Sequence, residues 1–142
     1  MKLIMDTLSD QDITDISASY GRCCISDVFF DRFYAIFLAS NPIVAGKFND
    51  TDMTKQKVAL RHGLTTLIMF AKGMGTAEDT LKKVAISHSK SNYDIAPELY
   101  PYWINSLIQA IKEVDGDKFT PELEKKWRIC LNIGLNYLAS LY

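Results

Sequence analysis

The sequence predicts an all-α protein of about six or seven helices. Apolar residues recur at spacings of three and four along almost the whole chain, and no segment shows the apolar–polar alternation of a half-buried strand. A chain of 142 residues that is 48% hydrophobic and 23% charged is typical of one ordinary folded domain and excludes a disordered chain. At this length roughly two thirds of the unfolded surface can be buried, which leaves a core large enough to hold a ligand.

The first two helices are delimited by a cap and by a proline. Ser9 precedes an acidic first turn, and the helix that it caps is predicted to end near Gly21. A second helix is predicted to begin near Ser26–Asp27 and to end at Asn41–Pro42, because proline disfavours helical geometry in the residue before it. Its apolar face is mostly aromatic and consists of Phe29, Phe30, Phe33, Tyr34 and Phe37.

A long helix is predicted in the middle of the chain. A short turn through Gly46 to Phe48 leads to Thr51, which is the predicted cap of this helix. Its apolar stripe continues until Gly73 and Gly75, which are predicted to stop it.

A shorter helix follows the long one. Thr76 and Asp79 resemble a capping pair at its start, and its apolar spacing extends to His88. A polar loop is predicted over residues 89–96.

The last two helices each begin at a proline. Pro97 is predicted to open one helix, and the sequence Asp-Gly-Asp at 115–117 ends it. Thr-Pro-Glu at 120–122 predicts the start of the final helix, since proline suits the first helical position and a carboxylate favours the positive helix end.

Charge balance and segment composition exclude several classes of function. The chain has 16 Lys and Arg against 17 Asp and Glu, and this net charge of −1 gives no electrostatic reason to bind nucleic acid or an anionic membrane. No apolar run approaches a transmembrane span, and the N-terminal stretch reaches Asp6 too soon for a signal peptide. Cys23, Cys24 and Cys130 form no paired framework, which is typical of buried thiols in a reducing compartment. We therefore expect a cytoplasmic protein, whose oligomeric state the sequence does not indicate.

Three polar side chains interrupt predicted apolar faces, and they are the informative residues. His88 lies four residues after Val84, so helical spacing points its imidazole inward. Gln56 lies four residues before Leu60 and extends the stripe of the long helix, and Tyr34 belongs to the aromatic helix. Taken singly, each has an ordinary explanation as a hydrogen-bonded core histidine, an exposed glutamine or a tyrosine whose hydroxyl reaches solvent.

Together the three describe an imidazole on one wall of an apolar cavity, facing an amide and a phenol. This arrangement suits a planar iron cofactor, because an imidazole nitrogen binds iron from one side and leaves the other side open to a diatomic ligand. Amide and phenol donors would stabilise the negative charge that such a ligand acquires, and apolar walls would keep water and protons away from the iron.

The stretch from His88 to Tyr100 reads HSKSNYDIAPELY, and two further segments precede it: QKVAL from Gln56 to Leu60, and FY at residues 33–34 followed by SNP at 40–42. These segments resemble the globin family, in particular the bacterial single-domain globins and the globin domain of flavohaemoglobins. The resemblance covers nearly the whole chain from about residue 9 onward, and its ordered set of positions is more specific than any one of them.

The resemblance implies a globin fold, a 3-over-3 helical sandwich in which residues 1–142 form a single globin domain that binds haem b. It implies that His88 is the axial iron ligand and that Tyr34 and Gln56 are the donors to O2, NO or CO. The cofactor contacts that it implies come from Phe48, Leu60, Val84, Tyr93, Ile95 and Tyr100.

Two assignments stay open. His62-Gly63 resembles the distal His-Gly pair of animal globins, but placing His62 inward would turn Leu60 and Leu64 off the haem face, so we prefer Gln56. The candidate partners of the haem propionates are Arg61, Lys57, Lys90 and Tyr93, among which the sequence does not choose.

Reversible binding of dioxygen is the function we expect. Flavohaemoglobins use a carboxylate near the chain end to hydrogen-bond the proximal histidine, whereas residues 136–142 read NYLASLY and contain no acid. No glycine-rich nucleotide fingerprint occurs, so reduction would need a separate reductase. The alternatives are nitric oxide dioxygenation with such a reductase, a haem-based gas sensor acting on a separate partner, and a globin-like domain without haem.

Overall fold

The computed structural model describes residues 7–142, which are mostly helical and contain no strand. Residues 1–6, on which the expected absence of a signal peptide rests, lie outside the described part. The seven α-helices within it are α2 (Asp10–Ile25), α3 (Phe29–Ser40), α4 (Pro42–Lys47), α5 (Met53–Ala71), α6 (Gly75–His88), α7 (Tyr100–Asp115) and α8 (Pro121–Ser140). The 3-10 turns η1 (Pro97–Leu99) and η2 (Gly116–Lys118) flank α7. The predicted all-α class is confirmed.

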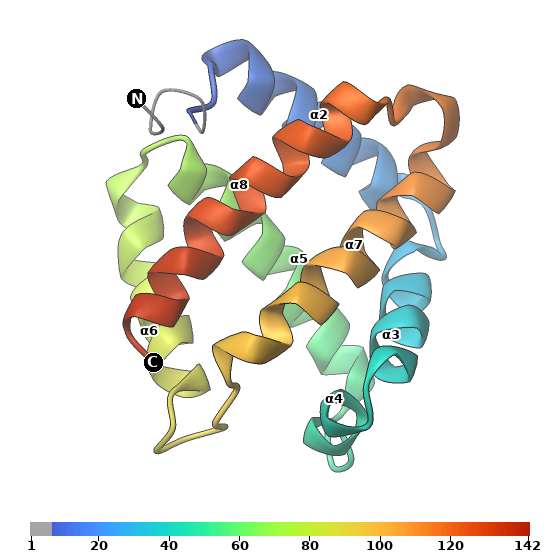
Figure 1. Cartoon of the computed structure of the whole chain (residues 1–142). Helices are drawn as coiled ribbons and strands as arrows, with labels where there is room; N and C mark the ends of the chain where they lie inside the picture. The colour runs from blue at the N-terminus through green and yellow to red at the C-terminus, as the bar shows by residue number, and fades with distance from the viewer. Residues whose placement is uncertain (1–6) are drawn as a thin grey trace.

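The six longer helices form two crossed layers (Figure 1). One layer holds α2, α5 and α6, the other holds α3, α7 and α8, and the short α4 connects α3 to α5. Between the layers α5 packs on α8 and α2 packs on α7, while α3 packs on α7 within its own layer. The largest fully buried side chains lie in this core and include Trp127, Phe29, Phe33, Ile16, Leu64 and Leu107.

Two of the predicted helix starts are confirmed by their hydrogen bonds. Ser9 and Asp12 form a reciprocal capping box, in which each side chain accepts from the other residue's backbone N–H, at 3.0 and 2.9 Å. The hydroxyl oxygen of Thr120 accepts from the N–H of Leu123 at 3.1 Å and caps α8. These caps depend on local sequence alone, which explains why they were predictable.

The predicted boundary between the first two helices was wrong at both ends. The first helix continues past Gly21 to Ile25, because the buried Cys23 extends its apolar face and a glycine inside a helix costs only about 1 kcal/mol. The second helix begins at Phe29 rather than at Ser26–Asp27, and no side chain caps it. Packing of the apolar faces outweighs the local signals at both places.

The segment between α3 and α5 also differs from the prediction. The predicted turn through Gly46 is the helix α4, which Asn41 caps by accepting from the N–H of Ile43 at 2.8 Å. The cap of α5 is Asp52 and not Thr51, since the Asp52 carboxylate accepts from the backbone of the first helical turn. Aspartate there also favours the positive end of the helix.

The starts of α6 and α7 were predicted only approximately. Gly75 opens α6 rather than stopping α5, Met74 occupies the cap position, and Thr76 and Asp79 form no capping pair. Gly73 makes the turn between the two helices with a φ of 92°, a conformation that favours glycine. Pro97 opens η1, and α7 itself begins three residues later.

Within residues 7–142, none of the helices combines the length and the apolar character needed to cross a membrane. Cys23 and Cys130 are buried as predicted, and Cys24 is half-buried. Burial raises the pKa of both buried thiols to about 12, so they remain uncharged at neutral pH.

Candidate functional site

A largely apolar cavity of about 390 Å³ lies between the two helical layers. Its volume falls within the range of about 300–1,000 Å³ that is usual for cofactor and ligand sites. Every residue that the sequence reading assigned to the iron, the cofactor or the ligand lines it: Tyr34, Phe48, Gln56, Leu60, Val84, His88, Tyr93, Ile95 and Tyr100. His62, the alternative distal residue, is exposed and does not line the cavity.

The imidazole of His88 occupies one wall, at the C-terminal end of α6. Its Nδ1 lies 2.8 Å from the backbone oxygen of Val84, so the ring N–H donates to this carbonyl and Nε2 is left for a ligand in the cavity. Burial lowers the pKa of His88, although the hydrogen bond to Val84 opposes the shift. The ring is therefore neutral at pH 7, which is the form that binds a metal.

Ser87 is a residue of this wall that the sequence reading missed. Its hydroxyl donates to the Val84 oxygen at 2.8 Å and lies 3.1 Å from Nδ1 of His88. In the described part of the chain no carboxylate hydrogen-bonds the His88 ring, so both neighbours of Nδ1 are neutral. A serine beside a helical histidine gives no periodic signal, and only the side-chain contact identifies its role.

The helices α3 and α5 contribute the phenol of Tyr34 and the amide of Gln56 to the lining of the same cavity. Tyr34 comes from α3 and is only 4% exposed, and its hydroxyl lies 3.5 Å from the backbone oxygen of Gln56 at the start of α5. Burial raises the pKa of Tyr34 to about 12, while a hydrogen bond with the Gln56 side chain opposes this shift. The hydroxyl is therefore a proton donor at neutral pH.

Aromatic rings enclose the space next to these donors. Phe48 follows the last turn of α4 and contacts the edges of Tyr34 and Phe37, each with ring centroids 5.9 Å apart. Phe33 lies between Tyr34 and Trp103, with ring centroids 4.9 and 6.0 Å away. A flat cofactor in the cavity would therefore meet the aromatic side chains of Phe37, Phe48 and Trp103, which line it.

The other lining residues were predicted as general core positions or not singled out. They are Phe37, Val44, Lys47, Ala59, Gly63, Thr66, Leu67, Leu81, Leu99, Trp103, Leu135 and Leu138, besides Ser87. Helical periodicity shows that such a residue faces inward, but it does not distinguish a cavity wall from a packed core. Among the four residues considered as propionate partners, only Tyr93 lines the cavity.

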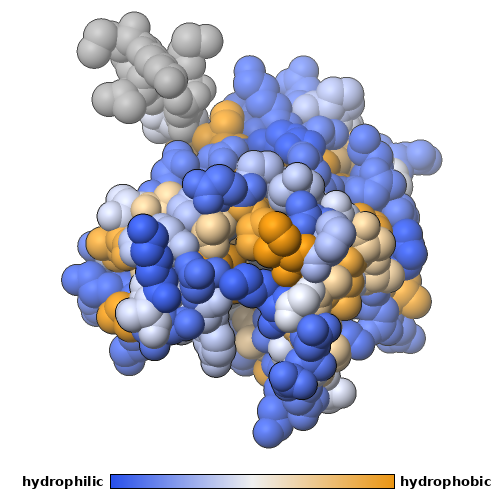
Figure 2. All heavy atoms as spheres, turned by 60° about the horizontal axis from the view of Figure 1, so that its bottom comes forward, coloured by the Kyte–Doolittle hydropathy of each residue, from blue (hydrophilic) through white to orange (hydrophobic). Residues whose placement is uncertain are grey.

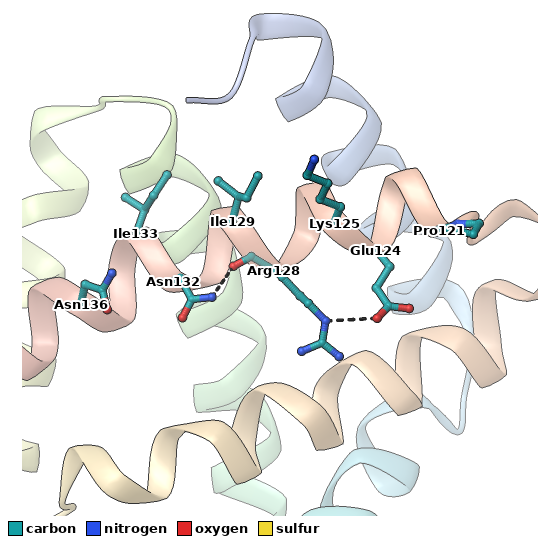
Figure 3. Close-up of a pocket in the computed structure, with 8 residues that line it drawn as sticks. All are labelled: Pro121, Glu124, Lys125, Arg128, Ile129, Asn132, Ile133 and Asn136. Carbon is teal, nitrogen blue, oxygen red and sulfur yellow. Dashed lines mark hydrogen bonds and ion pairs between the residues drawn. The ribbon is translucent and has the colours of Figure 1, made fainter. Parts of the chain in front are cut away.

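A second hollow, of about 530 Å³, runs along the outer face of α8 (Figure 3). All of its lining residues belong to this one helix. Two of its charged groups, Arg128 and Glu124, already have partners, since Arg128 donates to Glu124 at 3.1 Å and to Asn105 at 3.0 Å. It contains no imidazole or thiol that could bind a metal, so the cavity beside His88 is the candidate site.

The chain is similar to several known proteins. A Pseudomonas aeruginosa PAO1 protein, whose crystal structure is described as structurally highly homologous to a human hemoglobin, has 42% identical sequence and a TM-score of 0.88, over 92% of this chain and 98% of that one. The flavohemoprotein of Oceanobacillus iheyensis is 37% identical over 99 residues, and that of Bacillus subtilis (strain 168) is 31% identical over 98 residues. Each alignment covers 68% of this chain and 24% of the flavohemoprotein, so the chain matches about a quarter of their length. No family model matches.

Proposed function

The chain belongs to the bacterial globins, and from this premise we propose that it binds haem b through His88 and holds dioxygen reversibly. The observation that carries the proposal is that a single imidazole lines one largely apolar cavity together with a buried phenol and an amide. The names of the two flavohemoprotein relatives support haem as the cofactor. NO and CO would bind at the same position.

Each residue of the cavity has a separate task in this proposal. When bound, the haem would supply an iron centre able to take a nitrogen ligand and a diatomic gas. Nε2 of His88 would hold this group, while the hydrogen bond from Nδ1 to Val84 fixes the tautomer and the ring plane. Tyr34 and Gln56 donate to the ligand, while Phe48 and Leu60 exclude water from it.

The neutral surroundings of His88 favour reversible binding over oxidative chemistry. A carboxylate beside Nδ1 would increase the electron density that the imidazole gives to the iron. Here Nδ1 lies beside the Val84 carbonyl and the Ser87 hydroxyl, which are weaker acceptors than a carboxylate. This supports a protein that keeps and releases its ligand unchanged.

Haem uptake by the purified protein and two histidine variants test the cofactor assignment. We expect the wild type to bind one haem with an intense Soret band, and His88→Ala to lose it. Added imidazole should restore the band in His88→Ala, because the free ring can occupy the space left by the side chain. His62→Ala is the matched control and should bind haem as the wild type does, since His62 is exposed. An unaltered spectrum in His88→Ala would contradict the assignment.

Cycles of oxygen addition and removal test reversibility. The reduced protein should change its spectrum on adding oxygen and regain the first spectrum under vacuum over several cycles. Mixing the oxygenated protein with NO should give one stoichiometric event and no turnover unless a reductase is added. Sustained turnover with a candidate reductase would instead indicate nitric oxide dioxygenation.

A further inference from the structure

The mouth of the cavity lies between α4 and the loop of residues 89–96. Lys47, at the end of α4, and Tyr93, in the loop, both line the cavity and are both exposed, so they mark its opening. Figure 2 views the molecule from the side on which α4 and this loop lie, and shows hydrophobic atoms in a hollow that hydrophilic atoms surround. The ammonium of Lys47 donates to the backbone oxygen of Tyr93 at 3.5 Å and so joins the two sides of the opening.

Lys47 makes the mouth positively charged. Among the described residues that line the cavity it is the one lysine or arginine, and no carboxylate lines the cavity with it. An acidic group of a ligand would therefore be attracted to this end and to no other part of the apolar wall.

The three basic residues that the sequence offered as propionate partners contact other groups. Lys57 forms an ion pair with Asp31. The guanidinium of Arg61 lies over the ring of Phe30, 4.9 Å from its centroid. Lys90 lies over the ring of Tyr142 at 5.4 Å. None of the three lines the cavity, so the structure favours Lys47, a basic residue that the sequence pattern did not indicate.

The partner of Lys47 is held in place, and the bond between them is long. The Tyr93 N–H donates to the Ser87 oxygen at 3.0 Å, and the Ile95 N–H donates to the His88 oxygen at 2.9 Å, which fixes the loop against the end of α6. A lysine bonded to a neutral carbonyl at 3.5 Å gains by exchanging it for a carboxylate, because hydrogen bonds between two charged groups are shorter and stronger.

We propose that Lys47 binds the propionate carboxylates of the porphyrin and orients its acidic edge toward the mouth between α4 and the 89–96 loop. The inference rests on the proposed function, since it takes haem as the occupant of the cavity. Lys47 then supplies the polar anchor at the opening, while the apolar walls hold the remainder of the ring.

The rate of porphyrin loss to an excess of a haem-scavenging apoprotein tests this proposal. Haem and haem dimethyl ester, whose carboxylates are capped, are loaded separately into the wild type and into Lys47→Gln. Because an exposed ion pair stabilises weakly, we expect Lys47→Gln to lose haem about two- to fivefold faster than the wild type, and Lys47→Glu about tenfold faster. The ester should leave the wild type and Lys47→Gln at the same rate. Added salt should speed haem loss from the wild type more than from Lys47→Gln.

The controls separate this inference from the proposed function. Lys55→Gln removes another exposed lysine that does not line the cavity, and it should lose haem at the wild-type rate. The role of Lys47 would be overturned if the wild type and Lys47→Gln lost haem at the same rate. It would also be overturned if Lys47→Gln lost haem and the ester faster than the wild type by the same factor. Either result would leave the haem site itself intact. If the wild type bound neither porphyrin, with no quenching of the Trp103 fluorescence in the cavity wall, the proposed function itself would fail.

Discussion

The cavity and the packed junction of α2, α7 and α8 both bury polar side chains, but they pair them differently. In the junction, Asp115 accepts from Ser19 at 2.7 Å and from two nitrogens of Arg22, and its side chain is 0% exposed. The indole N–H of Trp127 donates to the same Ser19 hydroxyl at 3.1 Å. Every polar group of this cluster has a partner at normal or short distance.

The polar groups of the cavity are paired incompletely. His88 uses one ring nitrogen for Val84 and leaves the other to the cavity, and the Tyr34 hydroxyl has its backbone contact only at 3.5 Å. A satisfied buried cluster stabilises a fold, whereas donors and acceptors with spare capacity beside an open space are available to a ligand. We therefore expect substitutions in the junction to lower stability and substitutions in the cavity to change ligand binding.

The largest expected effect is on ligand release in Tyr34→Phe. A buried hydrogen bond to a partly charged acceptor contributes about 1.5–3 kcal/mol, so loss of the phenol hydroxyl should speed oxygen dissociation about tenfold or more. Stopped-flow oxygen displacement by CO measures this rate. The midpoint of chemical unfolding should change little, since the contact of the hydroxyl with the protein backbone is long, at 3.5 Å. If Tyr34→Phe and Gln56→Ala both released oxygen at the wild-type rate, the polar groups of the cavity would not act on the ligand. The contrast between the cavity and the junction would then be lost.

The opposite result is expected for Asp115→Asn. The amide nitrogen would face the Arg22 and Ser19 donors, so the variant should lose about 1.5–3 kcal/mol of unfolding free energy. Guanidinium unfolding followed by circular dichroism measures this loss. Oxygen dissociation should equal that of the wild type, and a large change in that rate would show that the junction and the cavity are coupled.

The difference in unfolding free energy between the wild type and Asp115→Asn should become smaller at low pH. Burial alone would raise the pKa of Asp115, but hydrogen bonds from Arg22 and Ser19 outweigh it and hold the pKa below its usual 3.8. A carboxyl whose folded pKa is depressed stabilises the protein above the unfolded pKa, and this contribution is lost as the pH falls through the folded pKa. Unfolding midpoints of wild type and Asp115→Asn should thus differ constantly from pH 7 to about 4 and converge below that. Convergence already near pH 6 would mean that another group is responsible.

A smaller effect is expected where the wall of the cavity meets α8. A Cβ added at Gly134 would overlap a methyl carbon of Leu67, and Leu67 also lines the cavity. Gly134→Ala should cost about 1–3 kcal/mol of unfolding free energy through overpacking, and less when combined with Leu67→Ala.

Gly21→Ala is the matched control and the smallest effect. No atom lies within 4 Å of a Cβ added at Gly21, which is inside α2, so this variant should gain about 0.5–1 kcal/mol of unfolding free energy.

The double variant tests the Gly134 prediction. If the losses of unfolding free energy from Gly134→Ala and Leu67→Ala were additive, Leu67 would not be the side chain that limits the space for a Cβ at Gly134.

Local signals predicted much of the fold and failed where packing competed with them. The caps at Ser9 and Thr120 and the loop after His88 were predictable, because each depends on a few neighbouring residues. The continuation of α2 through Gly21 and the extra helix α4 were not, since apolar contacts with distant helices decide whether a weak local break is tolerated.

The candidate site divides in the same way. Periodicity and the order of motifs along the chain were enough to select the inward imidazole, the phenol and the amide, because the side of a helix on which a residue lies follows from its spacing. The spacing of residues along one helix does not show which side chains of other helices lie next to them. Only the tertiary structure shows three features of the site, because it brings side chains of different segments together. They are the contact of Ser87 with the His88 ring, the hydrogen bond of Lys47 across the opening, and the space that Gly134 leaves for Leu67.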